Sequence, residues 1–217
     1  MPQIVKIEFV SDVVCPWCAI SFHSLLRALD RVQGSITAEI SLQPFELDPM
    51  MPKGGEDSTA YVARKYGLSP EEAARNRQVI RARAAEVGFD MTAIANRRLY
   101  NTFDAHRLLH WAERNGRQVD LKRALFAAHF GYGADVSDHD VLARAAETVG
   151  LDLVAARQIL TSDAFAREVR TAEETWRGRG VQSVPTLVFA GKYVSSGART
   201  PDEFEQLLGQ AASLVGG

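Results

Sequence analysis

The chain has 217 residues, of which 46% are hydrophobic and 24% are charged, and its formal net charge at pH 7 is −2. This length is enough for one buried core with a sizeable insertion, or for two small domains. The charge balance gives no reason to expect nucleic acid as a partner. Because no apolar run reaches the roughly 18–20 residues of a membrane span, the sequence also predicts no membrane partner.

The N-terminal residues favour a cytoplasmic location. Residues 1–3 lead directly into an alternating stretch at 4–10, whereas a secretory signal needs a basic start, a longer apolar run and a small-residue cleavage site. The cytoplasm keeps thiols reduced, and structural disulfides are rare there. We therefore expect the two cysteines, Cys15 and Cys18, to serve chemistry rather than structure.

Hydrophobic periodicity predicts a strand, a helix and a second, parallel strand near the N-terminus. The first strand covers 4–10, the helix runs from about residue 14 to 32, and the second strand covers 36–45. This order fits a right-handed parallel crossover.

A loop rich in proline and glycine follows at 48–55, and the pattern is then helical from about Ser58 to Trp176. The predicted helices of this segment start at Ser69-Pro70 and then cover 99–115, 120–130, 138–149, 152–160 and 163–177.

Strand character returns only at 186–190 and 193–196, and a closing helix at 201–214 is capped by Thr200. The sequence therefore predicts an α/β fold in which both ends of the chain share one sheet. We predict that residues 1–57 and 177–217 form the sheet domain and that residues 58–176 form an inserted helical domain.

The segment Cys15-Pro16-Trp17-Cys18 has the spacing of a redox-active dithiol. The attacking thiol of such a centre must be ionised and exposed. Cys15 lies at the predicted first turn of a helix, where unpaired N–H groups and the helix dipole stabilise a thiolate. Pro16 suits this position because its missing N–H would have no partner there. Cys18 lies one turn further on the same face, so the spacing predicts Cys15 as the attacking thiol and Cys18 as the resolving thiol.

Metal binding is a weaker explanation of the same residues. The cysteine pair fits half of a zinc site, but a structural zinc site needs four ligands and His23 is the only histidine nearby. His106 and His110 have the spacing of a two-histidine metal site, but the glutamate of such a motif is absent between them. We predict no metal, and two inert core thiols at this spacing stay open as a further alternative.

A second feature is Ser183-Val184-Pro185-Thr186, directly before the late strand. Alone it means little, because only about 5–6% of X–Pro bonds are cis. Together with the dithiol in a strand–helix–strand unit, it resembles the thioredoxin superfamily, whose members place a cis-proline loop beside the active dithiol. The resemblance implies that Pro185 is cis, that it packs against Cys15 and Cys18, and that the Val184 backbone pairs with a substrate chain. A trans proline that simply opens the strand is the alternative.

Within this superfamily the long helical insertion resembles the DsbA-like branch, and more specifically the FrnE-type proteins. These are grouped with 2-hydroxychromene-2-carboxylate isomerases and kappa-class glutathione transferases. The resemblance implies a thioredoxin fold interrupted by a large all-helical insertion, with protein disulfide oxidation, reduction or isomerisation as the activity. The segments that carry it are 12–18 (DVVCPWC), 45–49 (FELDP), 101–107 (NTFDAHR), 184–186 (VPT) and 196–198 (SGA).

The sequence thus predicts a cytoplasmic thiol–disulfide oxidoreductase or disulfide isomerase acting on thiol- or disulfide-bearing proteins. Its redox centre would be a Cys15–Cys18 disulfide, with no tightly bound cofactor and with glutathione open as a reductant. The isomerases and transferases of the group typically carry serine where Cys15 stands. A glutathione-dependent small-molecule isomerase or transferase stays open as an alternative, as do a non-catalytic chaperone-like binding module and a dimer.

Several other residues are expected near the dithiol. Trp17 is expected to be exposed beside it, and the resemblance places His106 near the active-site cleft, although a packed helix histidine is the alternative. Between Arg64 and Arg98 there are eight basic and four acidic residues, which predicts a solvated helix face, with a surface for an acidic substrate or partner as the alternative. The residues expected to bind substrate or tune the thiols are Pro16, Trp17, His106, Val184, Pro185 and Thr186.

Overall fold

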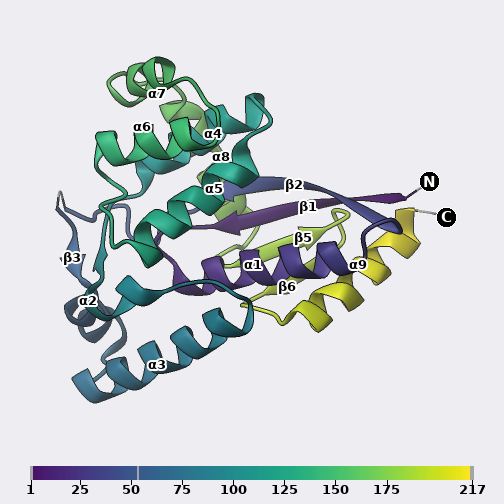
Figure 1. The fold of residues 1–217 in the computed structure, drawn as a ribbon, viewed down its shortest axis with the longest axis horizontal. Helices are drawn as coiled ribbons and strands as arrows, with labels where there is room; N and C mark the ends of the chain where they lie inside the picture. Colours follow the sequence, from purple (N-terminus) through teal and green to yellow (C-terminus); the bar gives the residue numbers. More distant parts are fainter. Residues whose placement is uncertain (1, 53, 216–217) are drawn as a thin grey trace.

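The computed structural model describes residues 2–52 and 54–215, so Met1, Lys53 of the predicted loop 48–55, Gly216 and Gly217 lie outside the described residues. A central sheet is flanked by two long helices, and a group of further helices lies at the end of the sheet away from the chain termini (Figure 1). Within the described ranges, no helix is long and apolar enough to cross a membrane.

The central sheet has four strands in the order β2-β1-β5-β6, so it is built from both ends of the chain, as predicted. Strand β1 is parallel to β2 and antiparallel to β5, and β5 is antiparallel to β6. The strands are β1 (Gln3–Ser11), β2 (Ile36–Pro44), β5 (Thr186–Phe189) and β6 (Tyr193–Ser196).

Helices α1 (Pro16–Arg31) and α9 (Pro201–Val215) cover one face of this sheet. Alternate residues of β1 point into the core there, and the Phe9 ring lies 6.2 Å from the Phe22 ring of α1. In the same core, the Phe189 ring of β5 lies 6.1 Å from the Phe204 ring of α9. Truncating a buried ring of this kind to alanine costs about 3–5 kcal/mol.

The segment between β2 and β5 is largely helical, and the predicted helices are confirmed to within a few residues apart from the one at 99–115. The start at Ser69 is a capping box, in which the Ser69 hydroxyl accepts from the Glu72 N–H and the Glu72 carboxylate accepts from the Ser69 N–H. The division into domains at residues 57 and 177 stays a prediction. The helices are α2 (Ser58–Tyr66), α3 (Pro70–Glu86), a 3₁₀ helix (Thr92–Asn96), α4 (Phe103–Arg114), α5 (Gln118–Phe126), a π-helical turn (Ala127–Gly131), α6 (His139–Thr148), α7 (Leu153–Leu160) and α8 (Ala166–Gly178).

Two predictions for this segment are wrong. Strand character does not return only at residue 186, because β3 (Glu56–Asp57) pairs antiparallel with β4 (Arg98–Leu99). The helix predicted at 99–115 begins instead at Phe103, because Leu99 belongs to β4 and the Asn101 side chain accepts from the Phe103 N–H. Two-residue strands carry too little alternation to be seen in the sequence.

Helix α5 joins the helical segment to the edge of the sheet. The Gln118 side chain accepts from the Leu42 N–H at 2.8 Å and donates to the Leu42 carbonyl at 3.0 Å. Both bonds satisfy edge groups of β2 that would otherwise need water or another strand. Gln118, Lys122 and Phe126 follow at i, i+4 and i+8, so one face of α5 is turned to the sheet.

Candidate active site

Cys15 caps helix α1. Its backbone is extended, Pro16 occupies the first helical position, and the Cys15 sulfur accepts a hydrogen bond from the Cys18 N–H at 3.3 Å. The helix therefore starts two residues later than predicted, and Cys15 sits at its positive end. An N–H donor and a helix N-terminus both stabilise negative charge on this sulfur.

The two thiols are free, and their surroundings differ. Cys18 is fully buried, and burial together with the adjacent Cys15 sulfur raises the pKa of its thiol well above the ordinary value. Only 4% of Cys15 is exposed to solvent, so the expectation of a solvent-exposed attacking thiol is wrong. However, Cys15 borders a cavity, which gives a ligand access to the residue.

Val184, the residue before the late proline, contacts the dithiol. The Val184–Pro185 bond is cis, as the resemblance implies, and the Cys15 thiol donates to the Val184 carbonyl at 3.9 Å. Thr186 is buried, and its hydroxyl donates to the Ser183 carbonyl rather than lining the cavity. Two segments more than 160 residues apart in sequence thus meet at the Cys15 sulfur.

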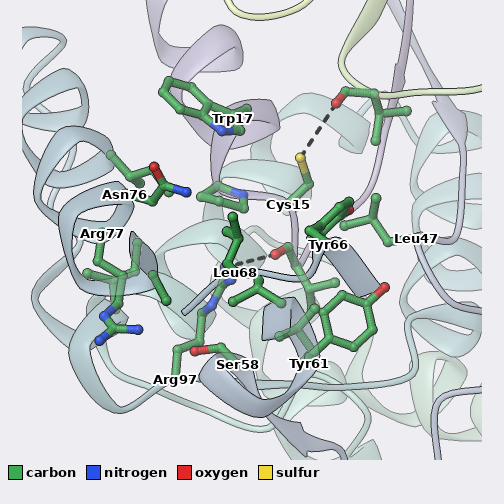
Figure 2. A pocket seen from close by; sticks show the side chains of 18 residues that line it. Cys15, Trp17, Leu47, Ser58, Tyr61, Tyr66, Leu68, Asn76, Arg77 and Arg97 are labelled. Carbon is green, nitrogen blue, oxygen red and sulfur yellow. Dashed lines mark hydrogen bonds between the residues drawn. The ribbon is translucent and has the colours of Figure 1, made fainter. Parts of the chain in front are cut away.

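The cavity beside Cys15 has a volume of about 370 Å³. Its walls come from the start of α1, from α2 and α3, and from the 3₁₀ helix and β4, with Val184 at one side. Figure 2 shows Trp17 near Cys15, and the dashed line from the Cys15 sulfur marks its bond to Val184. Pro16 and Trp17 line the cavity, and Trp17 is 37% exposed, so the dithiol opens into a partly enclosed, mainly apolar space.

Buried charged groups lie behind the dithiol. The Asp12 carboxylate accepts from the Leu47 N–H at 2.7 Å and lies 3.5 Å from His106 Nε2, which also contacts the Phe45 carbonyl at 3.1 Å. Burial alone would raise the pKa of the Asp12 carboxyl, but the contacts with His106 and Leu47 outweigh it, and the pKa lies below the ordinary value. His106 is 3% exposed and does not line the cavity, and its contacts are with the loop before Cys15 and with Phe45.

Two cationic residues near the thiols were not singled out from the sequence. Lys122 is 1% exposed, and its Nζ lies 5.1 Å from the centre of the Phe126 ring. Burial lowers the pKa of Lys122 to about 8, although the neighbouring Cys18 and Asp12 side chains oppose the shift. Arg97 is 8% exposed and donates to the carbonyl of Val14, the residue before Cys15. The only sequence signal for Lys122 is its i+4 spacing from Gln118 on α5.

In the described part of the chain, the candidate metal ligands do not come together at the dithiol. His23, the candidate third zinc ligand, stacks on the Phe89 ring at 4.2 Å between ring centres. Among residues 2–52 and 54–215, no three His, Cys, Asp or Glu side chains come together as metal ligands would.

Comparison with known proteins agrees with this geometry. A model of the DSBA-like thioredoxin domain matches residues 6–209. The chain belongs to this family. Members of the DSBA-like family include oxidoreductases, and the family fold is the thioredoxin fold with a helical insertion that the sequence predicts.

Individual relatives span nearly the whole chain. The probable DsbA oxidoreductase SCO1869 of Streptomyces coelicolor is 32% identical, with a TM-score of 0.87 over 96% of this chain and 90% of its own. The uncharacterized protein YwbO of Bacillus subtilis is 24% identical over 94% of this chain and 96% of its own. The cytosolic disulfide reductase DsbM of Pseudomonas aeruginosa, solved with GSH, shares the fold at 14% identity, with a TM-score of 0.60 over 94% of this chain and 98% of its own.

Proposed function

We propose that this protein is a thiol–disulfide oxidoreductase or isomerase of protein substrates, with Cys15 as the attacking thiol and Cys18 as the resolving thiol. The observation that carries the proposal is the position of the Cys15 sulfur, which caps α1 and lies at the edge of the cavity. A helix N-terminus and an N–H donor favour negative charge on a neighbouring sulfur, and a thiolate is the nucleophile in disulfide exchange.

The reaction follows in two exchanges. The Cys15 thiolate attacks one sulfur of a substrate disulfide, so that a Cys15–substrate disulfide forms and the other substrate sulfur leaves as a thiolate. Cys18 then loses its proton and attacks the Cys15 sulfur, so that a Cys15–Cys18 disulfide forms and the substrate's second thiolate is released. The substrate gains two electrons and the protein dithiol is oxidised, and the reverse steps oxidise a substrate dithiol.

The division of roles rests on the difference between the two thiols. Cys18 is fully buried with a raised pKa, so it stays protonated and out of reach of a substrate until a mixed disulfide has formed at Cys15. Val184 and Pro185 support the substrate chain beside Cys15 in this proposal, because the Val184 carbonyl already contacts its sulfur.

The test compares two matched variants in insulin reduction with dithiothreitol as the electron donor. Cys15→Ser is expected to fall to the rate of dithiothreitol alone. Cys18→Ser, reduced and then freed of dithiothreitol before it is mixed with insulin, is expected to accumulate a covalent Cys15–substrate adduct, which intact mass detects and added dithiothreitol releases. Full turnover by Cys15→Ser would contradict the proposal. Equilibration of the wild type against glutathione buffers then gives the redox potential and hence the favoured direction.

Glutathione is a second candidate for the reductant that regenerates the dithiol. The observation that favours it is the relative DsbM, whose structure was solved with GSH. Regeneration at cellular glutathione concentrations, followed by loss of the Cys15–Cys18 disulfide, tests this role. We further propose that the protein is of the FrnE type and acts in the cytoplasm, where thiols are kept reduced.

A further inference from the structure

The cavity beside Cys15 holds two guanidinium groups and no carboxylate. Arg77 of α3 and Arg97, just before β4, both line it, whereas the described residues of its lining include no aspartate or glutamate. Figure 2 shows both arginines among the side chains around the pocket that Cys15 borders. The remaining walls are mainly aliphatic and aromatic, including Tyr61, Ile80 and Leu99.

Arg97 is held in place but is not neutralised. Its Nη1 donates to the Val14 carbonyl at 3.0 Å, and its guanidinium lies 5.3 Å from the centre of the Phe130 ring. Its Nε is buried without a hydrogen-bond partner among the described residues. Burial and the nearby charge of Arg77 lower the pKa of Arg97 to about 10, against the opposing effect of Cys15.

Two other arginines of the same segment, Arg64 and Arg83, are paired with carboxylates. Arg64 lies 2.7 Å from a Glu56 carboxylate oxygen, and Arg83 lies 3.0 Å from one of Glu86. In the described part of the chain, neither Arg77 nor Arg97 has a carboxylate within 4.0 Å, and Arg77 donates to the Thr59 hydroxyl. Arg97 is a buried cation, Arg77 beside it is half-buried, and a buried cation without a counter-ion is costly, so this arrangement is suited to an anion that arrives with a ligand.

We propose that Arg77 and Arg97 form a carboxylate-binding subsite that selects thiols and disulfides carrying an acidic group on an apolar body. Guanidinium groups bind carboxylates through charge-assisted hydrogen bonds, and the apolar walls take up the rest of the ligand. The carboxylate can belong to a free thiol acid or to an acidic residue next to the cysteine of a peptide. This inference rests on the proposed function, because the selected group is attached to the sulfur that reacts with Cys15.

The test measures how fast the reduced protein reacts with two small disulfides, the dianionic dithiobis(nitrobenzoate) and the neutral dithiodipyridine. In each reaction the disulfide takes two electrons from the dithiol. This leaves a Cys15–Cys18 disulfide and two molecules of the released thiol, with the protein's protons passing to the buffer or to the leaving group. Each rate is divided by the rate of the same disulfide with dithiothreitol, which removes the difference in intrinsic reactivity.

Arg77→Gln is expected to slow the reaction with the anionic disulfide by about ten- to a hundredfold and to leave the neutral one within about twofold. Arg77→Lys is expected to restore much of the preference. The control is Arg75→Gln, on the same helix but exposed and outside the cavity lining, which should behave as wild type. Equal slowing of both disulfides, or no effect on either, overturns the subsite.

Two further measurements show which kind of ligand carries the acidic group and whether the subsite binds it without disulfide exchange. Disulfide-linked peptides that differ only by Glu or Gln beside the cysteine show whether a peptide acid uses the subsite. If only the small acid responds to Arg77→Gln, the ligand is a free thiol acid. Equilibrium binding of nitrobenzoate against neutral nitrobenzamide, in wild type and Arg77→Gln, tests the subsite without any exchange. If neither disulfide reacts but the wild type binds nitrobenzoate more tightly than nitrobenzamide, the proposed function fails and the anion site stands. Equal binding of nitrobenzoate and nitrobenzamide overturns the anion site.

Discussion

Lys122→Met is expected to stabilise the fold. Methionine keeps an unbranched stem in the buried position and removes the charge. Because the pKa of Lys122 lies at about 8 instead of 10.5, the folded state disfavours the ammonium at neutral pH. At about 1.4 kcal/mol per pKa unit, the shift corresponds to about 3 kcal/mol, which is the upper limit of the expected gain in unfolding free energy at pH 7.

The pH dependence gives this prediction a definite sign. Between pH 8 and 10.5 the unfolded chain still holds the Lys122 proton while the folded chain has released it. The wild type therefore gains stability as pH rises through this window, and the difference from Lys122→Met disappears near pH 10.5. Cys18 has the opposite effect in the reduced protein, since its raised pKa makes the folded state retain a proton at high pH. The comparison is therefore made with the Cys15–Cys18 disulfide formed.

Urea unfolding followed by circular dichroism at pH 7, 8, 9 and 10 measures both effects. Lys192→Met is the matched control, because Lys192 is exposed in the turn between β5 and β6 and should change neither stability nor slope. A Lys122→Met protein that is less stable than wild type at pH 7, with an unchanged pH slope, would refute the reasoning. Lys122 would then be a favourably paired charge.

Three further changes test other parts of the structure. Gln118→Ala removes two hydrogen bonds to the edge of β2 and should lower the unfolding free energy by about 2 kcal/mol in urea titrations; unchanged stability would show that water replaces both bonds. Gly55→Ala should lower the thermal midpoint, because its Cβ would lie 2.0 Å from the Leu99 carbonyl oxygen, whereas Gly54→Ala has a similar positive φ and open space and should cost less. His129→Leu should flatten the loss of stability in acid. Burial lowers the pKa of His129 to about 3, so the wild type loses up to about 1.4 kcal/mol per pH unit from this residue as pH falls from 6.5 towards 3. Urea midpoints at pH 6.5 and 5 show whether that slope belongs to His129.

The sequence predicted the elements whose position depends on interactions between residues close together in the chain. Residues 4–10 alternate, Ser69-Pro70 carries its own helix cap, and Cys15-Pro16 marks a helix start; all three appear in the structure near the expected residues. The order of the predicted strands already indicated that both chain ends share one sheet, and the resemblance added the cis bond at Pro185.

What the sequence did not reveal depends on contacts between distant segments. A lone lysine in a helix, such as Lys122, looks the same in sequence whether it faces water or a core, and only the docking of α5 on β2 buries it. Arg97 likewise belongs to a basic segment that predicts a solvated face, yet its position after the 3₁₀ helix turns it toward Cys15. His106 is near the active-site loop, but Asp12 and the Phe45 carbonyl hold it in the interior.

The few residues around the dithiol belong to two different cores. Val13 and Val14 pack into the apolar cluster of helices α4 to α7, whereas Cys15 and Cys18 pack into the cluster that the sheet shares with α1, α9 and part of the helical segment, including Ile80 of α3. The start of α1 thus lies at the boundary between the two apolar clusters. A rotation of helices α4 to α7 relative to the sheet would therefore displace the peptide immediately before the reactive sulfur. The position of the Cys15 sulfur is thus coupled to helices α4 to α7 through the packing of Val13 and Val14.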